Sequence, residues 1–373
     1  MKLNVKSSNA KQHRRRFSLR KILIILRTFP IFHLSRKDTL IFRSSRQDWV
    51  GDGFVDKYTR DYEHENGLTA VGIYETNLEY SNFKNNLPSI YIAQYIEYVG
   101  GVLLYFLYWF TTRISNSFTR DLNVFLQLTG DLSSKKEIIL ALARFKISFW
   151  LYLSIFKVRR PTKIILTNYV SKLSLIGAAK HLGISVVEVQ HGFTSPALLL
   201  YHFPSAREGS LAYFPDVFIY RDKYLWLDVD IPLKSDCVIE ESSAVAGQNI
   251  NLIRGEEVLY ISQPDSSNLI VEHINSIIDR INISNIHVKL HPGELSNIML
   301  IDRLKSMGLK VIMDAENFHL ASYSKVIGAY STMLVDAWKE GCSVYSISGS
   351  HIVYIDSFIQ RGLIREIKLG QEP

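Results

Sequence analysis

The sequence predicts an α/β protein made of two Rossmann-like, doubly wound domains that face each other across an interdomain cleft. In both halves of the chain, short β-branched runs alternate with helical patterns, which is typical of parallel sheets covered by helices. Residues 163–190 indicate a strand, a helix and a strand, a span of about 30 residues that suits a βαβ crossover. A polar stretch rich in Asn and Gly, residues 242–257, separates the two alternations. The 373 residues are enough for two domains of ordinary size.

We expect four segments along the chain. Residues 1–20 form a disordered basic arm, and residues 21–245 form a Rossmann-like first domain with a helical insertion. Residues 246–350 form a Rossmann-like second domain. Residues 351–373 form a C-terminal tail. One arrangement open to this tail is to pack back on the first domain.

The elements of the first half follow from apolar runs and turn residues. Ser171–Leu182 is predicted to be a helix that ends at Gly183, where a glycine suits the C′ position. Residues 44–53 are expected to form a loop, and a helical pattern begins at Val55. The expected strands are Asp38–Arg43, Leu68–Tyr74, Lys163–Thr167, Ile184–Gln190 and Val217–Tyr220.

The second half repeats the alternation of strands and helices, which predicts a second doubly wound sheet. The expected strands are Val258–Ser262, His287–Leu290, Lys310–Met313, Lys325–Ala329 and Ser343–Ile347, and the expected helices are Asn268–Ile281, Ile298–Met307 and Thr332–Glu340.

Composition favours a globular protein with an unevenly placed charge. Hydrophobic residues make up 47% of the chain, and the two cysteines, Cys237 and Cys342, have no metal-site spacing. Residues 1–47 hold 13 Lys and Arg and one acid, so 30 of the 43 basic residues and 35 of the 36 acids remain for the rest. The body is therefore mildly acidic, which argues against a nucleic-acid groove. The basic arm is either a solvated tail or a contact with an anionic membrane surface.

No secretory signal peptide is expected, because Arg27 interrupts the apolar run of residues 22–26 and no small-residue cleavage site follows. Residues 90–156 are mostly helical in pattern. Two aromatic-rich stretches, Val99–Phe110 and Ile147–Phe156, are shorter than the ~20 apolar residues that span a bilayer. We interpret both as core helices of the first domain, with interfacial contact as the alternative.

Polar residues end or follow four of the expected strands. In an open α/β sheet, ligands bind beyond the carboxyl ends of the strands, so these residues are candidates for one shared site. His291-Pro292 is the most specific pair, because Pro292 stops the strand and places the histidine at the sheet edge. Lys289 lies two residues earlier, and Gln263 ends another strand before Pro264.

Two further strand ends complete the candidate set. Gln190, His191 and Gly192 close a strand of the first domain, where Gly192 permits a tight turn and His191 is a candidate base or sugar contact. Ser331 and Thr332 lie between a strand and a helix. They are good N-cap residues, and a helix start also binds phosphate. Asp336, one turn further on, is either a solvated helix residue or a ligand of a ribose or base.

The runs VVEVQHG, YISQP, VKLHPG and GAYST, followed by Asp336 and Glu340-Gly341, together resemble bacterial surface-polysaccharide glycosyltransferases of the GT-B fold. Sialyl- and polysialyltransferases, with HP and Ser-Ser/Thr motifs, and capsule and teichoic-acid polymer transferases are the most similar groups. The resemblance covers roughly residues 160–350. It implies that His291 and Ser331-Thr332 contact the phosphates of a nucleotide-sugar donor and that Asp336 contacts its ribose or base.

In the sialyltransferase group, an acidic residue of the first domain serves as the catalytic base. The acidic motif that carries this residue is missing from the present sequence. Asp48 and Asp52, in the loop after the first strand, are the candidates beside His191, and a plain turn role for Asp52-Gly53 is at least equally open. Asp228-Val229-Asp230 spells a DxD sequence but has no further acidic ligand nearby, so no metal is expected. No GxGxxG, Walker or GxSxG sequence is present, which disfavours dehydrogenases, P-loop enzymes and α/β-hydrolases.

The resemblance therefore implies a metal-independent GT-B glycosyltransferase in capsule or O-antigen biosynthesis. Its donor would be CMP- or UDP-linked, and its acceptor a glycan or lipid-linked glycan. It would act in the cytoplasm, peripheral to the inner face of the membrane, without nucleic-acid partners or a cofactor. A nucleotide-sugar 2-epimerase of the same fold and a non-catalytic membrane-associated assembly protein are the alternatives.

Overall fold

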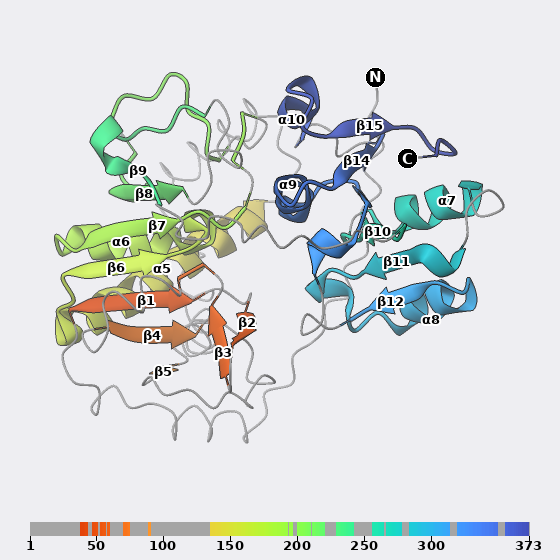
Figure 1. Ribbon diagram of the computed structural model, residues 1–373. Helices are drawn as coiled ribbons and strands as arrows, with labels where there is room; N and C mark the ends of the chain where they lie inside the picture. Colours follow the sequence, from red (N-terminus) through yellow and green to blue (C-terminus); the bar gives the residue numbers. More distant parts are fainter. Residues whose placement is uncertain are drawn as a thin grey trace, which may run out of the picture.

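The computed structural model describes the chain in sixteen ranges, which are residues 38–43, 47–50, 53–56, 58–59, 70–74, 89–90, 135–192, 194–196, 200–209, 211–220, 229–241, 256–264, 266–277, 283–313, 319–349 and 355–372. They form two parallel sheets and a two-stranded antiparallel hairpin (Figure 1). The α/β class with two doubly wound parallel sheets is as predicted.

The first sheet has the strand order β5-β4-β1-β6-β7-β8-β9, and all neighbouring strands are parallel. From β1 the chain winds outward through β4 and β5, and it then returns to the other side of β1 with β6. The switch point of this sheet therefore lies between β1 and β6. Its strands are β1 Thr39–Arg43, β4 Ala70–Tyr74, β5 Ser89–Ile90, β6 Lys163–Leu166, β7 Ser185–Val189, β8 Val217–Tyr220 and β9 Val238–Glu240.

A hairpin lies where a loop and the start of a helical pattern were expected after β1. Strands β2 (Gln47–Val50) and β3 (Gly53–Asp56) pair antiparallel, with Val50 opposite Gly53. Two-residue connections of this kind favour Gly and Asp, the residue types at positions 51 and 52. Val55 and Asp56 therefore lie in a strand and not in a helix, because cross-strand pairing outweighs the local helical pattern here. Most of the helical pattern that was expected after them lies outside the described residues.

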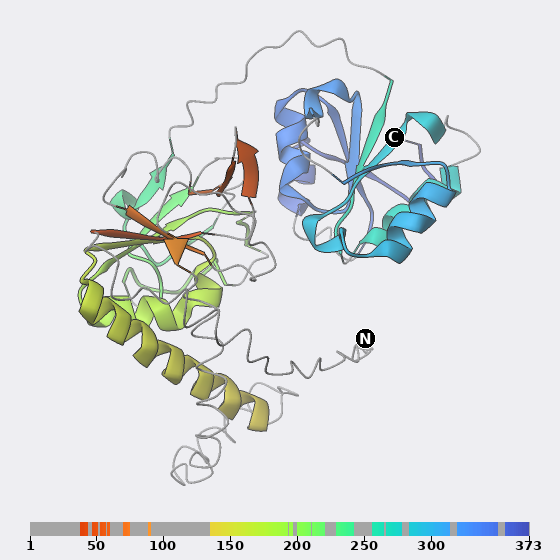
Figure 2. The ribbon, with the colours of Figure 1, turned by 90° about the horizontal axis from the view of Figure 1, so that it is seen from below.

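Helices α5 (Lys135–Arg159) and α6 (Leu173–His181) lie together on one side of the first sheet (Figure 2). Their apolar residues pack against strand residues such as Phe42 and Leu166 in one core. The aromatic stretch Ile147–Phe156 falls within α5, and Leu153 and Phe156 are buried in that core while Trp150 is exposed. The stretch Val99–Phe110 lies outside the described residues. Within the part of the chain that the structure describes, no helix is long and apolar enough to cross a membrane.

Local sequence determines where helix α6 begins and ends within the crossover from β6 to β7. A 3-10 turn, η3 (Tyr169–Lys172), joins strand to helix, and Asn168 before it adopts a left-handed conformation with φ 55°. Gly183 has φ 70°, and its N–H donates to the Lys180 carbonyl. This confirms the predicted glycine at the end of the helix.

The second sheet has the strand order β12-β11-β10-β13-β14-β15, again all parallel. This is the Rossmann order 3-2-1-4-5-6, whose switch point lies at the first strand, β10, beside β13. The strands are β10 Val258–Ile261, β11 Ile286–Lys289, β12 Lys310–Ile312, β13 Lys325–Gly328, β14 Ser343–Ile347 and β15 Arg365–Ile367.

Helices cover both faces of the second sheet (Figure 2). The helices α7 (Ser267–Ile277) and α8 (Ile298–Ser306) share one apolar core with Tyr260 and Val288. On the other face, α9 (Thr332–Lys339) and α10 (Asp356–Gln360) share a second core. Figure 1 shows the arrowheads of β6 and β7 pointing toward the second sheet and those of β11 and β12 pointing toward the first. The carboxyl ends of the two sheets therefore face each other.

The C-terminal residues belong to the second sheet. Strand β15 pairs with β14, and Phe358 of α10 is buried in the core beneath them. His273 of α7 is also buried, and its Nε2 lies 3.1 Å from the Gln371 carbonyl oxygen. Residues 355–372 therefore do not form a tail on the first domain, because strand pairing and apolar burial hold them in the second.

Candidate functional site

The site is built at the switch point of the second sheet. β10 lies between β11 and β13, so the residues that follow these three strands meet at one edge. The Ser262 N–H continues the ladder by donating to the Lys289 carbonyl at 2.9 Å. His291 follows β11, and Ser331 follows β13. The strand ends of VKLHPG, YISQP and GAYST are therefore brought together by strand order.

A tight turn fixes the His291 ring. The residues Pro292–Glu294 form a 3-10 turn, and the Gly293 N–H donates to His291 Nδ1 at 3.0 Å. A ring nitrogen that accepts a hydrogen bond carries no proton, so the imidazole is the neutral Nε2–H tautomer. In this tautomer the histidine donates a hydrogen bond through Nε2.

Gly293 is close to the ring that it orients. A Cβ at this position would lie 3.2 Å from His291 Nδ1 and 3.7 Å from Pro264 Cγ. The ring would have to move to admit even a methyl group. The absence of a side chain at Gly293 therefore lets the imidazole keep its close approach to the backbone.

Glu294 ties two strand ends together and was not identified from sequence. It is buried, with 3% of its surface exposed. Its Oε1 accepts from the Ser262 hydroxyl at 3.0 Å, and its Oε2 accepts from the His291 N–H at 3.0 Å. An acidic residue three positions after a strand-ending histidine is the only sequence signal for it.

The start of α9 forms the second part of the site. Ser331 is the N-cap, in extended conformation, and its Oγ accepts from the Met333 N–H at 3.3 Å. Thr332 is the first helical residue and is half-buried, as is Asp336 one turn further on. At the end of β13, a Cβ on Gly328 would lie 3.3 Å from the Ile261 carbonyl oxygen. The absence of a side chain there lets β10 and β13 approach at the switch point.

The remaining candidates of the second domain lie on the same edge. Lys289 is the half-buried last residue of β11, and Pro292 opens the 3-10 turn. Gln263 is half-buried, and its carbonyl accepts from the Ser266 N–H at 2.9 Å. Apart from Asp336, which lies one turn inside α9, all candidate residues of this domain therefore follow or end the three central strands or start the next helix.

The first-domain candidates lie at the end of β7. Gln190 is buried, and its Nε2 donates to Thr194 Oγ1 at 3.1 Å, so it ties the following loop. His191 is half-buried, and its ring packs edge-on against Tyr58 at 6.2 Å between centroids. Gly192 has no positive φ, and a Cβ there would meet nothing within 4 Å. The expected steric need for glycine at 192 is therefore not found.

A buried carboxyl group next to these residues escaped the sequence interpretation. Glu188 of β7 is fully buried, and its Oε1 accepts from the Tyr201 hydroxyl at 2.6 Å and from the Tyr169 N–H at 3.1 Å. Its Oε2 has no hydrogen-bond partner among the described residues. Burial raises the pKa of Glu188 to about 7, although hydrogen bonds from Tyr201 and from the backbone of Tyr169 and Asn168, together with the charge of Lys172, oppose the rise. Lys172 itself donates to the Thr167 carbonyl at 2.5 Å.

Glu188 therefore joins β7 to the turn at the end of β6, beside the switch point of the first sheet. A charged residue inside a strand of β-branched neighbours, VVEVQ, is the signal that could have found it, because such residues are rarely buried without partners.

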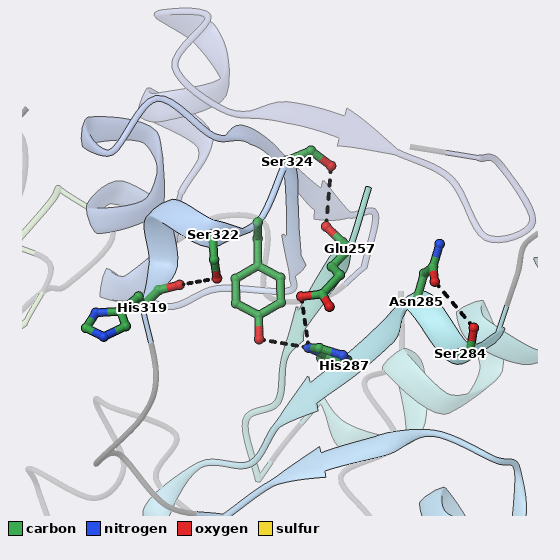
Figure 3. A network of polar contacts seen from close by, with 8 residues as sticks. Glu257, Ser284, Asn285, His287, His319, Ser322 and Ser324 are labelled. Carbon is green, nitrogen blue, oxygen red and sulfur yellow. Dashed lines mark hydrogen bonds and ion pairs between the residues drawn. The ribbon is translucent and has the colours of Figure 1, made fainter. Parts of the chain in front are cut away.

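A second histidine of the second domain lies away from this edge. His287 is at the amino end of β11, where Glu257 and Ser324 also lie (Figure 3). Its Nδ1 is 2.9 Å from the Tyr323 hydroxyl and 3.6 Å from Glu257 Oε2. Burial lowers the pKa of His287, so it is a neutral core residue rather than a site residue.

Two aspartates considered from sequence, Asp52 and Asp228, lie outside the described residues. Asp230 is exposed. In the described part of the chain, no three His, Cys, Asp or Glu residues lie close enough together to hold a metal ion.

No protein-family model and no curated protein matches the chain. Several solved structures can be superposed on the chain, at low sequence identity. MurG of Acinetobacter baumannii is 8% identical, with a TM-score of 0.45 over 90% of this chain and 87% of that one. CalG4, the calicheamicin glycosyltransferase, is 10% identical, with a TM-score of 0.48 over 90% and 86%. The UDP-GlcNAc 2-epimerase of Methanocaldococcus jannaschii is 10% identical, with a TM-score of 0.43 over 88% of each chain. All three TM-scores are below 0.5, so none of these likenesses identifies a family or an activity.

Proposed function

We propose that this protein is a nucleotide-sugar glycosyltransferase of the GT-B type. The observation that carries the proposal is the meeting of three polar strand ends at the switch point of the second sheet. There, His291 and the start of α9 flank β10 on its two sides. A switch point in a sheet of order 3-2-1-4-5-6 is the place where nucleotides bind in doubly wound folds.

The second domain would hold the donor. The phosphates would lie at the N-terminus of α9, where free N–H groups and the helix dipole favour negative charge. His291 Nε2–H would donate to a phosphate oxygen of the leaving nucleotide, and its donation would strengthen as charge develops there. Asp336 would contact the ribose or base from within the same helix.

The first domain would supply the acceptor side. In the transfer, the bond between the anomeric carbon and the phosphate oxygen breaks, and a bond forms between that carbon and the acceptor oxygen. The acceptor proton would pass to a base, for which His191 and Asp52 are the candidates. The structure places His191 at the carboxyl end of β7, on the sheet edge that faces the second domain (Figure 1).

The acceptor would be a glycan or a lipid-linked glycan of a bacterial surface polysaccharide such as capsule or O-antigen. The basic arm, residues 1–20, supports this part of the proposal, since it would hold the enzyme at the anionic cytoplasmic face of the membrane. The proposed reaction uses no metal, because His291 and the helix N-terminus take the role of a cation at the leaving group.

Nucleotide binding tests the proposal first. In a thermal-shift series with CMP, UDP, GDP and CDP, at least one nucleotide should raise the unfolding midpoint, since it binds only the native state. The matching nucleotide sugar is then incubated with and without glycan acceptors, in the presence of excess EDTA.

Three outcomes separate the functions. Release of nucleotide only with acceptor, undiminished by EDTA, supports the transferase. Conversion of the sugar at C2 without acceptor identifies an epimerase. No shift with any nucleotide would leave a non-catalytic assembly protein and would end the proposal. Strict dependence on manganese would restore Asp228 and Asp230 as candidate ligands.

A further inference from the structure

We infer that Glu294 is a positioning residue for His291: it holds the His291 backbone to the end of β10 and thereby keeps the imidazole as a fixed Nε2–H donor. The inference rests on the proposed function for its catalytic consequence, but its structural part can be measured without any substrate.

Both carboxylate oxygens of Glu294 are used, and each reaches a different strand end. Oε1 accepts from Ser262, which follows β10, and Oε2 accepts from the N–H of His291, which follows β11. The Glu294 N–H also donates to the His291 carbonyl at 2.8 Å. The backbone N–H of His291 is therefore held by the Glu294 carboxylate, and its carbonyl is held by the Glu294 backbone N–H.

This arrangement controls the ring through Gly293. The Gly293 N–H, which holds Nδ1, lies in the turn that Glu294 closes. If the carboxylate is lost, the turn loses its link to β10, and the bond between Gly293 and the ring loses its fixed geometry. A neutral imidazole that is no longer held in this way exchanges between its two tautomers. The proposed donor to the leaving phosphate would then be present for only part of the time.

The burial of Glu294 supports a specific role. A buried carboxylate costs free energy unless its oxygens are satisfied, and an apolar residue would serve mere packing better. Here, each oxygen accepts from a group on a separate strand end, which an apolar residue cannot do. The same geometry predicts which substitutions keep the function. In Glu294→Gln the amide oxygen can accept from His291, and the amide N–H can donate to Ser262, because a hydroxyl also accepts.

Histidine nitrogen NMR on the full-length protein tests the inference. Protein with ¹⁵N-labelled histidine is recorded near pH 8, and the His291 signals are assigned by their loss in His291→Asn. We expect wild type and Glu294→Gln to show a single Nε2–H tautomer. Glu294→Ala should show a mixture. The control Glu272→Gln, on the exposed face of α7, should match the wild type.

A merely structural role predicts a different result. Glu294→Ala would then unfold more easily, yet its folded form would keep the wild-type tautomer, and that result would overturn the inference. If Glu294→Ala does not fold, Glu294→Asp takes its place, since its shorter side chain cannot reach both strand ends. A wild-type tautomer in Glu294→Asp would likewise overturn the inference.

Activity separates this inference from the proposed function. With a nucleotide sugar that the wild type uses, kcat of Glu294→Ala should fall by about 100-fold, as expected for a misplaced catalytic group, while Glu294→Gln stays near wild type. Equal losses in both variants would count against positioning. If the wild type transfers no sugar at all, the proposed function fails, while the tautomer measurement still decides the role of Glu294.

Discussion

At the scale of single residues, His291 is the group on which donor binding should depend. His291→Ala would remove the proposed hydrogen bond to a charged phosphate, and such a bond is worth about 1.5–3 kcal/mol, or roughly 10- to 150-fold in affinity. Titration calorimetry with the nucleotide that gives the largest thermal shift measures the loss. Unchanged affinity and turnover in a folded His291→Ala protein would remove this residue from the site.

The glycine beside His291 allows a more selective test. Gly293→Ala places a methyl group 3.2 Å from His291 Nδ1, so the ring must move while every other site residue remains. We expect nucleotide affinity to fall by about tenfold, the cost of one misplaced hydrogen bond. Gly192→Ala is the steric comparison, because its methyl group meets nothing within 4 Å, and it should unfold at the wild-type midpoint. Wild-type affinity in Gly293→Ala would show that the ring position is unimportant.

The buried Glu188 sets how the first domain responds to pH. Its pKa rises from 4.5 in the unfolded chain to about 7 in the fold. Between these values, unfolding releases a proton, so this group makes the free energy of unfolding fall as pH rises from about 4.5 to 7. The effect is on the order of 3 kcal/mol if the whole shift is expressed.

Replacing the carboxyl group should remove this pH dependence. The free energy of unfolding of the first domain is measured with urea at pH 5 and at pH 8. The excess of the pH 5 value over the pH 8 value should be smaller for Glu188→Gln than for wild type. The exposed Glu208→Gln provides the control and should keep the wild-type difference. If Glu188→Gln also kept that difference, the carboxyl would not be the group that titrates.

At the scale of elements, His273 couples helix α7 to the C-terminal segment. Its Nδ1 lies 3.0 Å from the Tyr260 hydroxyl, and its Nε2 lies 3.1 Å from the Gln371 carbonyl oxygen. Burial lowers the pKa of His273 below its usual 6.5. The unfolded chain therefore binds a proton that the fold does not, and this group makes stability fall as pH drops below about 6.5.

His273→Gln should reduce this acid sensitivity, because an amide can donate to Gln371 and accept from Tyr260 without a charge. The measurement is the midpoint of the thermal transition of the second domain at pH 7.5 and pH 5.5. His319→Gln, an exposed histidine of the same domain, should behave as wild type. An equal drop in midpoint for His273→Gln and wild type would contradict the assignment.

The sequence predicted most strands of both sheets to within one or two residues, because β-branched runs and the glycine at 183 are local signals. It missed β15, since a three-residue edge strand with two exposed positions has no apolar pattern. Glu188 carried a local signal and could have been found. Glu294 could not, because its role depends on β10 lying beside β11, and strand order is not written in any single segment.

At the scale of the whole molecule, the two domains should respond to pH in opposite directions. Acid favours the buried carboxyl of the first domain and disfavours His273 and His287 of the second, whose pKa values are both lowered by burial. Unfolding of the two sheets should therefore separate as pH falls, and a single midpoint would describe neither of them.

The charge distribution predicts how the whole protein meets a membrane. Residues 1–21 contain eight Lys and Arg and no acid, and each contributes about 1 kcal/mol near an anionic leaflet, an attraction that salt weakens. High salt should release the protein from membrane fractions, and deletion of residues 1–21 should do the same at low salt. If the deleted protein still needs detergent for release, the anchor lies elsewhere in the chain.

The position of β15 also affects how the protein is made. The second sheet starts with β10 at Val258, but its edge is completed only by residues 365–367. Until these residues leave the ribosome, β14 has one unpaired backbone edge that can pair with another chain. In the interval between the synthesis of β14 and that of β15, the nascent protein therefore exposes the edge of a mostly buried strand that the finished fold covers, and a holding chaperone or a lower expression temperature would act there.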